Sequence, residues 1–206
     1  MTETTLWERS QHRLSQDDLG RRLVHVAGTG FPALYVLPFV EWWLVGAIML
    51  GATAIASLVE LGRLRFGLDL FLFDYLRRYE EDSLGAYLLF MLSATAVALA
   101  FGPQVAIPAI LMLTIADPVA GAASVDELRR VKRPRALVTM FLACAVLTVP
   151  FVHEEPLAVV LGGTGGMVAD GIKPVVRGVI IDDDLTIAPA GALGIWVGLQ
   201  LGGVPL

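Results

Sequence analysis

Long runs without ionisable side chains dominate the chain. Residues 83–116 contain no Asp, Glu, Lys, Arg or His, and Gly102 followed by Pro103 divides this run into two segments. Residues 185–206 are likewise free of charge. Because a helix of roughly 20 apolar residues crosses the hydrocarbon core of a bilayer, such runs predict membrane-spanning helices.

The apolar runs predict an all-α fold, a polytopic transmembrane helical bundle that forms one domain over residues 1–206. A polar segment, 1–22, precedes the bundle, 23–206, and we expect this segment to form a short surface helix. Residues 66–81 mix aromatic with charged side chains, which predicts an amphipathic helix in the membrane interface. The seven expected spans are approximately 23–41, 43–61, 84–102, 104–123, 136–153, 156–172 and 186–205.

The basic residues predict the orientation of these spans. All 15 Lys and Arg residues fall before the first span or after the second, fourth and sixth. Short loops rich in Lys and Arg stay in the cytoplasm, so we expect a cytoplasmic N-terminus and an outer C-terminus. The protein is thus expected in the cell membrane, as a multi-pass protein with its charged face in the cytoplasm.

The composition fits a chain embedded in the lipid bilayer. Hydrophobic residues make up 56% and charged residues 17%, with a mean hydropathy of +0.70. No basic patch interleaved with aromatic residues indicates nucleic-acid binding. The first 20 residues lack the apolar core of a signal peptide. The single cysteine, Cys144, lies in an apolar run and is expected to serve packing.

Ionisable residues near the ends of the spans are candidates for a functional site, because charge at membrane depth is costly and usually faces the protein interior. On the predicted cytoplasmic side, carboxylates can hold Mg²⁺ while Arg and Lys bind phosphate oxygens, as phosphoryl transfer requires. The candidates are Arg22, His25, Glu60, Arg63, Asp117, Asp170, Lys173, Arg177, Asp182, Asp183 and Asp184.

Each of these residues also has a simpler interpretation. Glu60 with Arg63, or Asp170 with Lys173, can form an ordinary ion pair at a helix end. His25 can be a packing or capping residue, and the three consecutive aspartates can form a solvated loop or cap the last helix. The glycines in the sixth span favour close helix packing over a nucleotide loop; they are Gly162, Gly163, Gly165 and Gly166.

Several stretches, taken together, resemble the dolichol kinase, phytol kinase and CTP-dependent diacylglycerol kinase family. Residues 21–25 with Gly28 are similar to the family's basic-basic-x-x-His opening, and Glu60 with Arg63 matches the end of its next span. Residues 116–120 stand where the family has Gly-Asp-x-x-Ala. Most specific is 182–189, Asp-Asp-Asp-Leu-Thr-Ile-Ala-Pro, which is similar to the family's Asp-Asp-Asn-Leu-Thr-Ile-Pro.

The chain departs from the family pattern at several positions. Ala116 and Ser124 stand where glycine is expected, Asp170 replaces Glu, and Asp184 replaces Asn. The family's Lys-Ser-x-Glu-Gly-Ser type stretch is not recognisable, and residues 131–135 occupy that region.

The resemblance implies a membrane kinase that transfers a phosphoryl group from CTP, or ATP, to the hydroxyl of a lipid alcohol at the cytoplasmic face. It implies that Asp117, Asp183 and Asp184 hold Mg²⁺. Either His25 or Asp170 would accept the hydroxyl proton. Glu60 and Asp182 complete the site. The phosphate-binding candidates are Arg22, Arg63, Lys132, Arg133, Lys173 and Arg177.

Two other functions remain open at this point. A CTP-dependent cytidylyltransferase acting on a phosphatidate-like lipid would use the same metal and nucleotide but release pyrophosphate. A non-enzymatic transporter would need ionisable groups at mid-depth, and no charge falls clearly there. The sequence selects neither the lipid acceptor, whether polyprenol, phytol-like or diacylglycerol-like, nor the oligomeric state.

Overall fold

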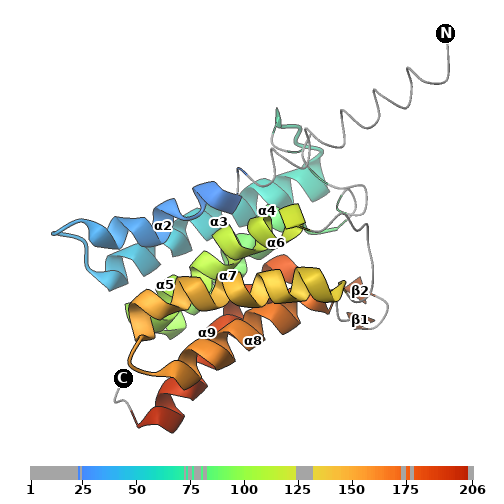
Figure 1. Cartoon of the computed structure of the whole chain (residues 1–206). Coiled ribbons are helices and arrows are strands. Elements are labelled where there is room, and N and C mark those ends of the chain that lie inside the picture. The colour runs from blue at the N-terminus through green and yellow to red at the C-terminus, as the bar shows by residue number, and fades with distance from the viewer. Residues whose placement is uncertain are drawn as a thin grey trace.

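The computed structural model describes residues 23, 25–71, 73, 76, 80, 83–123, 132–172, 175, 176 and 179–203. These residues form a bundle of helices (Figure 1), which confirms the predicted helical architecture, and one short two-stranded hairpin that the sequence did not predict. The elements are α2 (Gly30–Ala33), the 3₁₀ turn η1 (Leu34–Val36), α3 (Trp42–Phe66), α4 (Ala86–Ala100), α5 (Pro103–Leu111), the π-helical turn η4 (Met112–Ala116), α6 (Asp117–Ala123), α7 (Pro134–Val152), α8 (Pro156–Gly171), β1 (Val175–Val176), β2 (Val179–Ile180) and α9 (Asp183–Gly202).

Four helices in the described part of the chain are long and apolar enough to cross a membrane. They are Trp42–Phe66, Pro103–Ala122, Pro134–Val152 and Asp183–Gly202. Ala86–Ala100 is apolar but shorter. Together with α8, these helices cover six of the predicted spans, and most of their ends fall within three residues of the expected positions.

The first predicted span, 23–41, is wrong as a single continuous helix. The chain turns at Gly28 and Thr29, forms only the four residues of α2, and then tightens into η1. Leu37 is extended, with ψ 134°, because the residue before a proline avoids the helical conformation and Pro38 follows it. The first segment is therefore a series of short helical pieces.

The amphipathic helix predicted over 66–81 is also wrong in its first part. Helix α3 continues to Phe66 and ends at Gly67, whose φ of 65° is a left-handed conformation that glycine adopts without strain. Residues 68–70 follow without regular structure. Much of the remaining stretch, and the predicted surface helix within 1–22, lies outside the described residues.

Helices α8 and α9 pack with their backbones in close approach. A Cβ at Gly165 would lie 2.3 Å from the carbonyl oxygen of Ala190, and one at Gly194 would lie 2.3 Å from that of Leu161. Such distances leave room for hydrogen only. The predicted packing role of the glycines in this span is thus confirmed, since they sit within a helix and not in a phosphate-binding loop.

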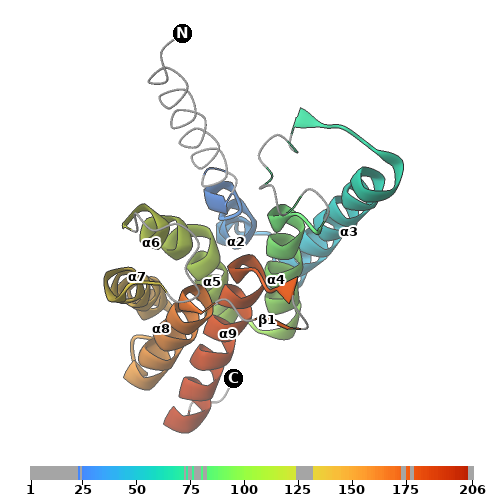
Figure 2. The same cartoon turned by 90° about the vertical axis from the view of Figure 1, so that its right-hand side faces the viewer.

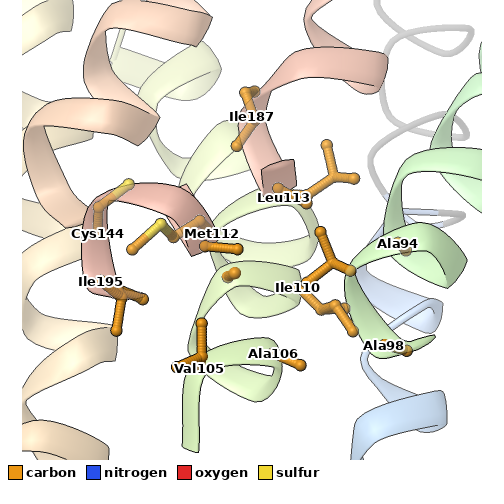
Figure 3. Close-up of a cluster of buried hydrophobic side chains, with 14 of the residues drawn as sticks. Ala94, Ala98, Val105, Ala106, Ile110, Met112, Leu113, Cys144, Ile187 and Ile195 are labelled. Atoms are coloured by element: carbon orange, nitrogen blue, oxygen red, sulfur yellow. The ribbon is translucent and has the colours of Figure 1, made fainter. Parts of the chain in front are cut away.

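Helix α5 and the η4 turn lie at the centre of the bundle (Figure 2). Helices α7, α8 and α9 follow one another on one side, and α4 joins α9 to α3 on the other. Met112 and Leu113 of η4 are fully buried, beside residues such as Cys144 and Ile195 (Figure 3). The packing role expected for Cys144 is confirmed.

Candidate active site

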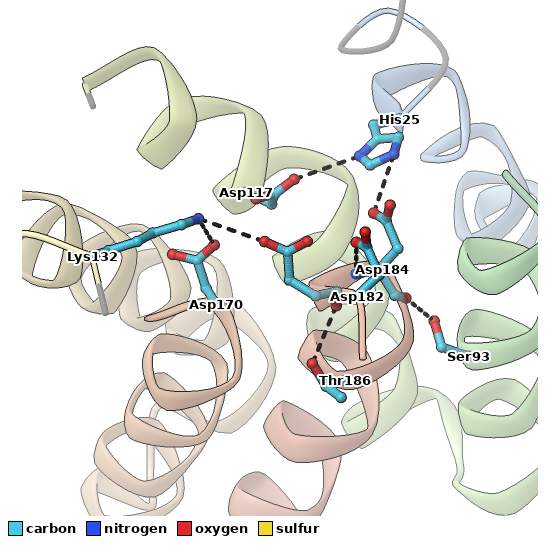
Figure 4. A network of polar contacts seen from close by, with 9 residues as sticks. His25, Ser93, Asp117, Lys132, Asp170, Asp182, Asp184 and Thr186 are labelled. Carbon is cyan, nitrogen blue, oxygen red and sulfur yellow. Dashed lines mark hydrogen bonds and ion pairs between the residues drawn. The ribbon is translucent and has the colours of Figure 1, made fainter. Parts of the chain in front are cut away.

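Five segments that are distant in the sequence bring polar side chains together at one end of the bundle (Figure 4). The structure places there the sequence candidates His25, Asp117, Lys132, Asp170, Asp182, Asp183 and Asp184. The short β1–β2 hairpin, in which Val175 pairs with Ile180 and Val176 with Val179, precedes α9 at this end. The site is thus assembled from the ends of helices that are otherwise apolar.

The three aspartates begin helix α9. Asp182 is its N-cap, and its side chain accepts a hydrogen bond of 3.2 Å from the backbone N–H of Asp184, which confirms the predicted capping role. Asp183 and Asp184 occupy the first turn, where the helix dipole stabilises negative charge. All three residues are buried. Capping therefore explains Asp182, whereas Asp184 contacts His25 and Asp183 contacts Lys132.

His25 lies between two of the carboxylates. Its Nδ1 is 3.6 Å from Oδ2 of Asp117, and its Nε2 is 3.3 Å from Oδ1 of Asp184. The ring stacks on Phe90 of α4 at 5.5 Å, and only 4% of the residue is exposed. Gly28 allows this approach, because a Cβ there would lie 2.3 Å from the Phe90 ring. His25 thus joins the N-terminal segment to α6 and α9.

Lys132 lies beside two further carboxylates. Its ammonium group pairs with Oδ1 of Asp170 and lies 3.6 Å from Oδ2 of Asp183. Its backbone N–H also donates to the carbonyl of Gly171 at 3.1 Å. Burial lowers the pKa of Lys132, but the nearby carboxylates outweigh that effect and raise the pKa above its ordinary value. Lys132 therefore stays cationic beside the acidic cluster.

Asp170 has an oxygen that no described residue satisfies. The residue is fully buried, and its Oδ2 has no hydrogen-bond partner among the described residues. A buried carboxylate oxygen without a partner is costly, and it therefore indicates that a proton or a cation belongs next to it. The predicted alternative pairing of Asp170 with Lys173 is not tested, since Lys173 lies outside the described residues.

The donor atoms are close enough together to share a cation. Ligand atoms lie within 4.8 Å of one another in three groups: His25 with Asp117 and Asp184, Asp117 with Asp170 and Asp183, and the run Asp182, Asp183 and Asp184. Asp117, Asp183 and Asp184 each belong to two of these groups. Carboxylate oxygens are the ligands that Mg²⁺ prefers, so the donor set and the unsatisfied Asp170 oxygen fit this ion.

Glu60 and Arg63 form a separate polar cluster between α3 and the start of α4. The carboxylate of Glu60 accepts bonds from Arg63 at 2.7 and 2.8 Å, from the Tyr87 hydroxyl at 2.6 Å and from the Gly85 N–H at 2.6 Å. Arg63 also donates to the carbonyl of Ser83 at 2.5 Å. These contacts confirm the ion-pair interpretation, and the phosphate-binding role of Arg63 stays a prediction.

The remaining basic candidates are less closely defined. Arg133 is the N-cap of α7 and is exposed, directly after Lys132. Arg22 and Arg177 lie outside the described residues. Sequence reasoning missed Ser93, whose hydroxyl donates to the Asp184 carbonyl at 2.7 Å. In the sequence, Ser93 stands out only as a polar residue within an apolar run.

The site combines buried carboxylates, a lysine and a histidine within an apolar bundle. This combination can bind a divalent cation and hold an anionic group such as a phosphate against it. A scan of protein-family models, a search of curated proteins and a search of solved structures each found no match to the chain.

Proposed function

We propose that the chain is a membrane kinase that transfers a phosphoryl group from a nucleoside triphosphate, with CTP favoured, to the hydroxyl of a lipid alcohol. One observation carries the proposal: Asp117, Asp170, Asp183 and Asp184 converge with Lys132 at one end of an apolar bundle. A divalent cation, a phosphate and a lipid can meet only where an apolar environment borders such a polar site. The preference for CTP rests on the family resemblance alone.

Mg²⁺ would be held by Asp117, Asp183 and Asp184, and when bound it supplies neutralisation of the charge on the phosphate oxygens. Lys132 is fixed by Asp170 and Asp183, so its ammonium group can draw a phosphate oxygen without a large rearrangement. Burial of these groups excludes water, which strengthens their interactions and protects the triphosphate from hydrolysis.

Asp170 is the better of the two candidates for accepting the hydroxyl proton. Its Oδ2 is buried without a partner among the described residues, whereas both ring nitrogens of His25 already face carboxylates. His25 would then act as a positioning residue that holds Asp117 and Asp184 in place. Proton transfer is a modest part of the catalysis, because phosphoryl transfer depends mainly on alignment and charge.

The proposed topology has seven membrane-crossing segments, with the site at the cytoplasmic face of the cell membrane. Its support is that Lys132 of the site and the neighbouring Arg133 precede α7, while Glu154 and Glu155 lie at the opposite end of α7, in the turn before α8. The broken first segment would cross as short helical pieces packed against α3.

The direct test incubates the purified chain in detergent with Mg²⁺, γ-labelled CTP or ATP, and a lipid alcohol. Geranylgeraniol, phytol, a polyprenol and diacylglycerol form the acceptor set. We expect a labelled lipid phosphate, with CDP or ADP as the other product, and none when EDTA removes the metal. Formation of pyrophosphate and a CDP-lipid from phosphatidate would instead support the cytidylyltransferase. No labelled lipid from any pair would contradict the kinase.

A further inference from the structure

A cavity of about 570 Å³ runs along helix α5, and the proposed function has not used it. Pro103, Ile107 and Leu111 line it at intervals of four residues, so they form one face of the helix from its first residue to its last. Nine residues of helix correspond to about 13 Å. Residues of the first segment and the end of α7 form the other walls.

The inner end of the cavity reaches the polar site. Thr29 lines the cavity, and its hydroxyl donates to Oγ1 of Thr114 at 3.0 Å. Thr29 is four residues from His25, and Thr114 is three residues from Asp117. Both elements therefore place the end of the cavity about one helical turn from side chains of the site.

A hydrogen bond crosses the other end of the cavity, and the cavity opens to the surroundings along its side. Gln104 donates a hydrogen bond of 3.3 Å to the carbonyl of Phe151, and both residues line the cavity there. Val36, also in the lining, has 85% of its surface exposed and thus lies at the mouth. A long ligand would enter from the side, with its far end near Gln104 and its near end toward Thr29.

The chemistry and size of the cavity select one kind of ligand. Most of the lining side chains are Pro, Ala, Val, Ile, Leu or aromatic residues, which favour hydrocarbon. A volume of about 570 Å³ lies within the range of sites that hold one small ligand, about 300–1,000 Å³. A site of this size and apolar lining suits one hydrocarbon chain better than the two acyl chains of a diacylglycerol.

We propose that this cavity binds the hydrocarbon chain of a single-chain lipid alcohol and directs its hydroxyl past His25 toward Asp117 and Asp170. The inference deepens the proposed function and rests on it for the identity of the ligand as an acceptor. It narrows the acceptor class to alcohols with one long or isoprenoid chain.

Photo-crosslinking tests the proposal without depending on turnover. The probe is a long-chain primary alcohol with a diazirine near its far end, added to the purified full chain in detergent, and the labelled residues are found by mass spectrometry. We expect saturable labelling near Gln104 and Phe151 that an excess of geranylgeraniol removes and that diacylglycerol does not. Labelling spread over the lipid-facing helices without saturation, or equal competition by diacylglycerol, overturns the proposal.

Two variants block the cavity at different places. Ile107→Trp fills its middle and Val36→Trp its mouth, and each should lower the saturable labelling at least fivefold. Leu142→Trp, on an exposed face of α7, is the control and should leave it unchanged. Unchanged labelling in both cavity variants, with melting temperatures near that of the wild type, contradicts the proposal. Because Val36 is largely exposed, its variant remains informative if Ile107→Trp fails to fold.

The outcomes separate this inference from the kinase assignment. Saturable labelling of the cavity in a protein that phosphorylates no lipid would sustain the binding site and remove the proposed activity. Lipid phosphorylation without saturable labelling of the cavity would sustain the activity and remove this binding site.

Discussion

Lys132 and Asp170 are 38 positions apart in the sequence, yet their side chains form an ion pair that ties the segment before α7 to the end of α8. Asp170 is fully buried and contributes only one of its two oxygens to this pair. The pair therefore has two consequences, one for the stability of the bundle and one for its chemistry.

Lys132→Met should destabilise the protein, because it leaves the buried carboxylate of Asp170 without its cation. Breaking a buried ion pair costs about 3–5 kcal/mol, and the partial exposure of Lys132 reduces this to about 2 kcal/mol. Urea unfolding in detergent, followed by circular dichroism, measures the change. Arg135→Met removes an exposed cation from the same end of α7 and is the control. Equal stability of the two variants would show that the pair is energetically unimportant.

Asp183→Asn should weaken Mg²⁺ binding while leaving the fold intact, since Asp182, and not Asp183, caps α9. A ligand present at about 100 times its Kd stabilises the folded state by about 2.7 kcal/mol, so Mg²⁺ should raise the melting temperature of the wild type. The increase should be mostly lost in Asp183→Asn. The control Glu154→Gln, in the exposed turn between α7 and α8, should show the same Mg²⁺-dependent increase in melting temperature as the wild type. An equal increase in all three proteins contradicts a metal role for Asp183.

His25→Phe should lower the rate of lipid phosphorylation by about 100-fold, because a small displacement of aligned groups has an effect of this size. The phenyl ring keeps the stacking on Phe90 but removes the contacts to Asp117 and Asp184, so the melting temperature is measured beside the rate. Replacement of the other described histidine, His153→Phe, is the control, since its side chain is 68% exposed. If the rate with His25→Phe equals that of the control, His25 has only a packing role.

Gly165→Ala should destabilise the protein by more than about 1 kcal/mol, because the new methyl group would meet the Ala190 carbonyl at 2.3 Å. Gly51→Ala is the matched control, since a Cβ there meets nothing within 4 Å. Within a helix this control should stabilise by about 0.5–1 kcal/mol. Thermal unfolding of both variants tests whether the two substitutions change the stability in opposite directions. Stabilisation by Gly165→Ala would mean that α8 and α9 can separate at little cost.

Cysteine labelling tests the proposed orientation in a Cys144→Ala background. A cysteine at Glu154 should react with a membrane-impermeant maleimide in intact cells, while one at Arg133 should react only after permeabilisation. These two positions flank α7, so opposite behaviour is required if α7 crosses the membrane. Equal reactivity of both in intact cells would exclude the proposed topology.

The apolar runs were sufficient to predict most of the helices. Runs such as 136–153 and 186–205 correspond closely to α7 and α9, because lipid and helix packing both require continuous apolar surface. Hydropathy could not predict the broken first segment. There the outcome depends on Gly28, which must approach Phe90, and on Pro38, which constrains its neighbour.

The candidate site could be predicted only in part. Asp117, Asp170 and the aspartates that begin α9 all lie at span ends on the same predicted side of the membrane. This shared position indicated that they would gather at one end of the bundle. Which groups pair could not be predicted, because contacts such as Lys132 with Asp170 depend on how distant helices are placed. Local spacing favoured Lys173 as a partner of Asp170, a pairing that lies outside the described residues, and only tertiary packing brings Lys132 to the same carboxylate.

The π-helical turn η4 adjusts the rotational phase of the helix in which it lies. A π turn carries an extra residue, and each residue of an α-helix advances the side-chain direction by about 100°. The turn therefore lets Leu111 face the hydrocarbon cavity while Asp117 faces the carboxylates, two directions that a regular helix would set differently. Deletion of one residue within Met112–Ala116 would restore regular α-helical winding and rotate Asp117 away from its partners. The π-helical turn thus lets one continuous helical rod present an apolar side chain to the cavity and an acidic side chain to the polar site.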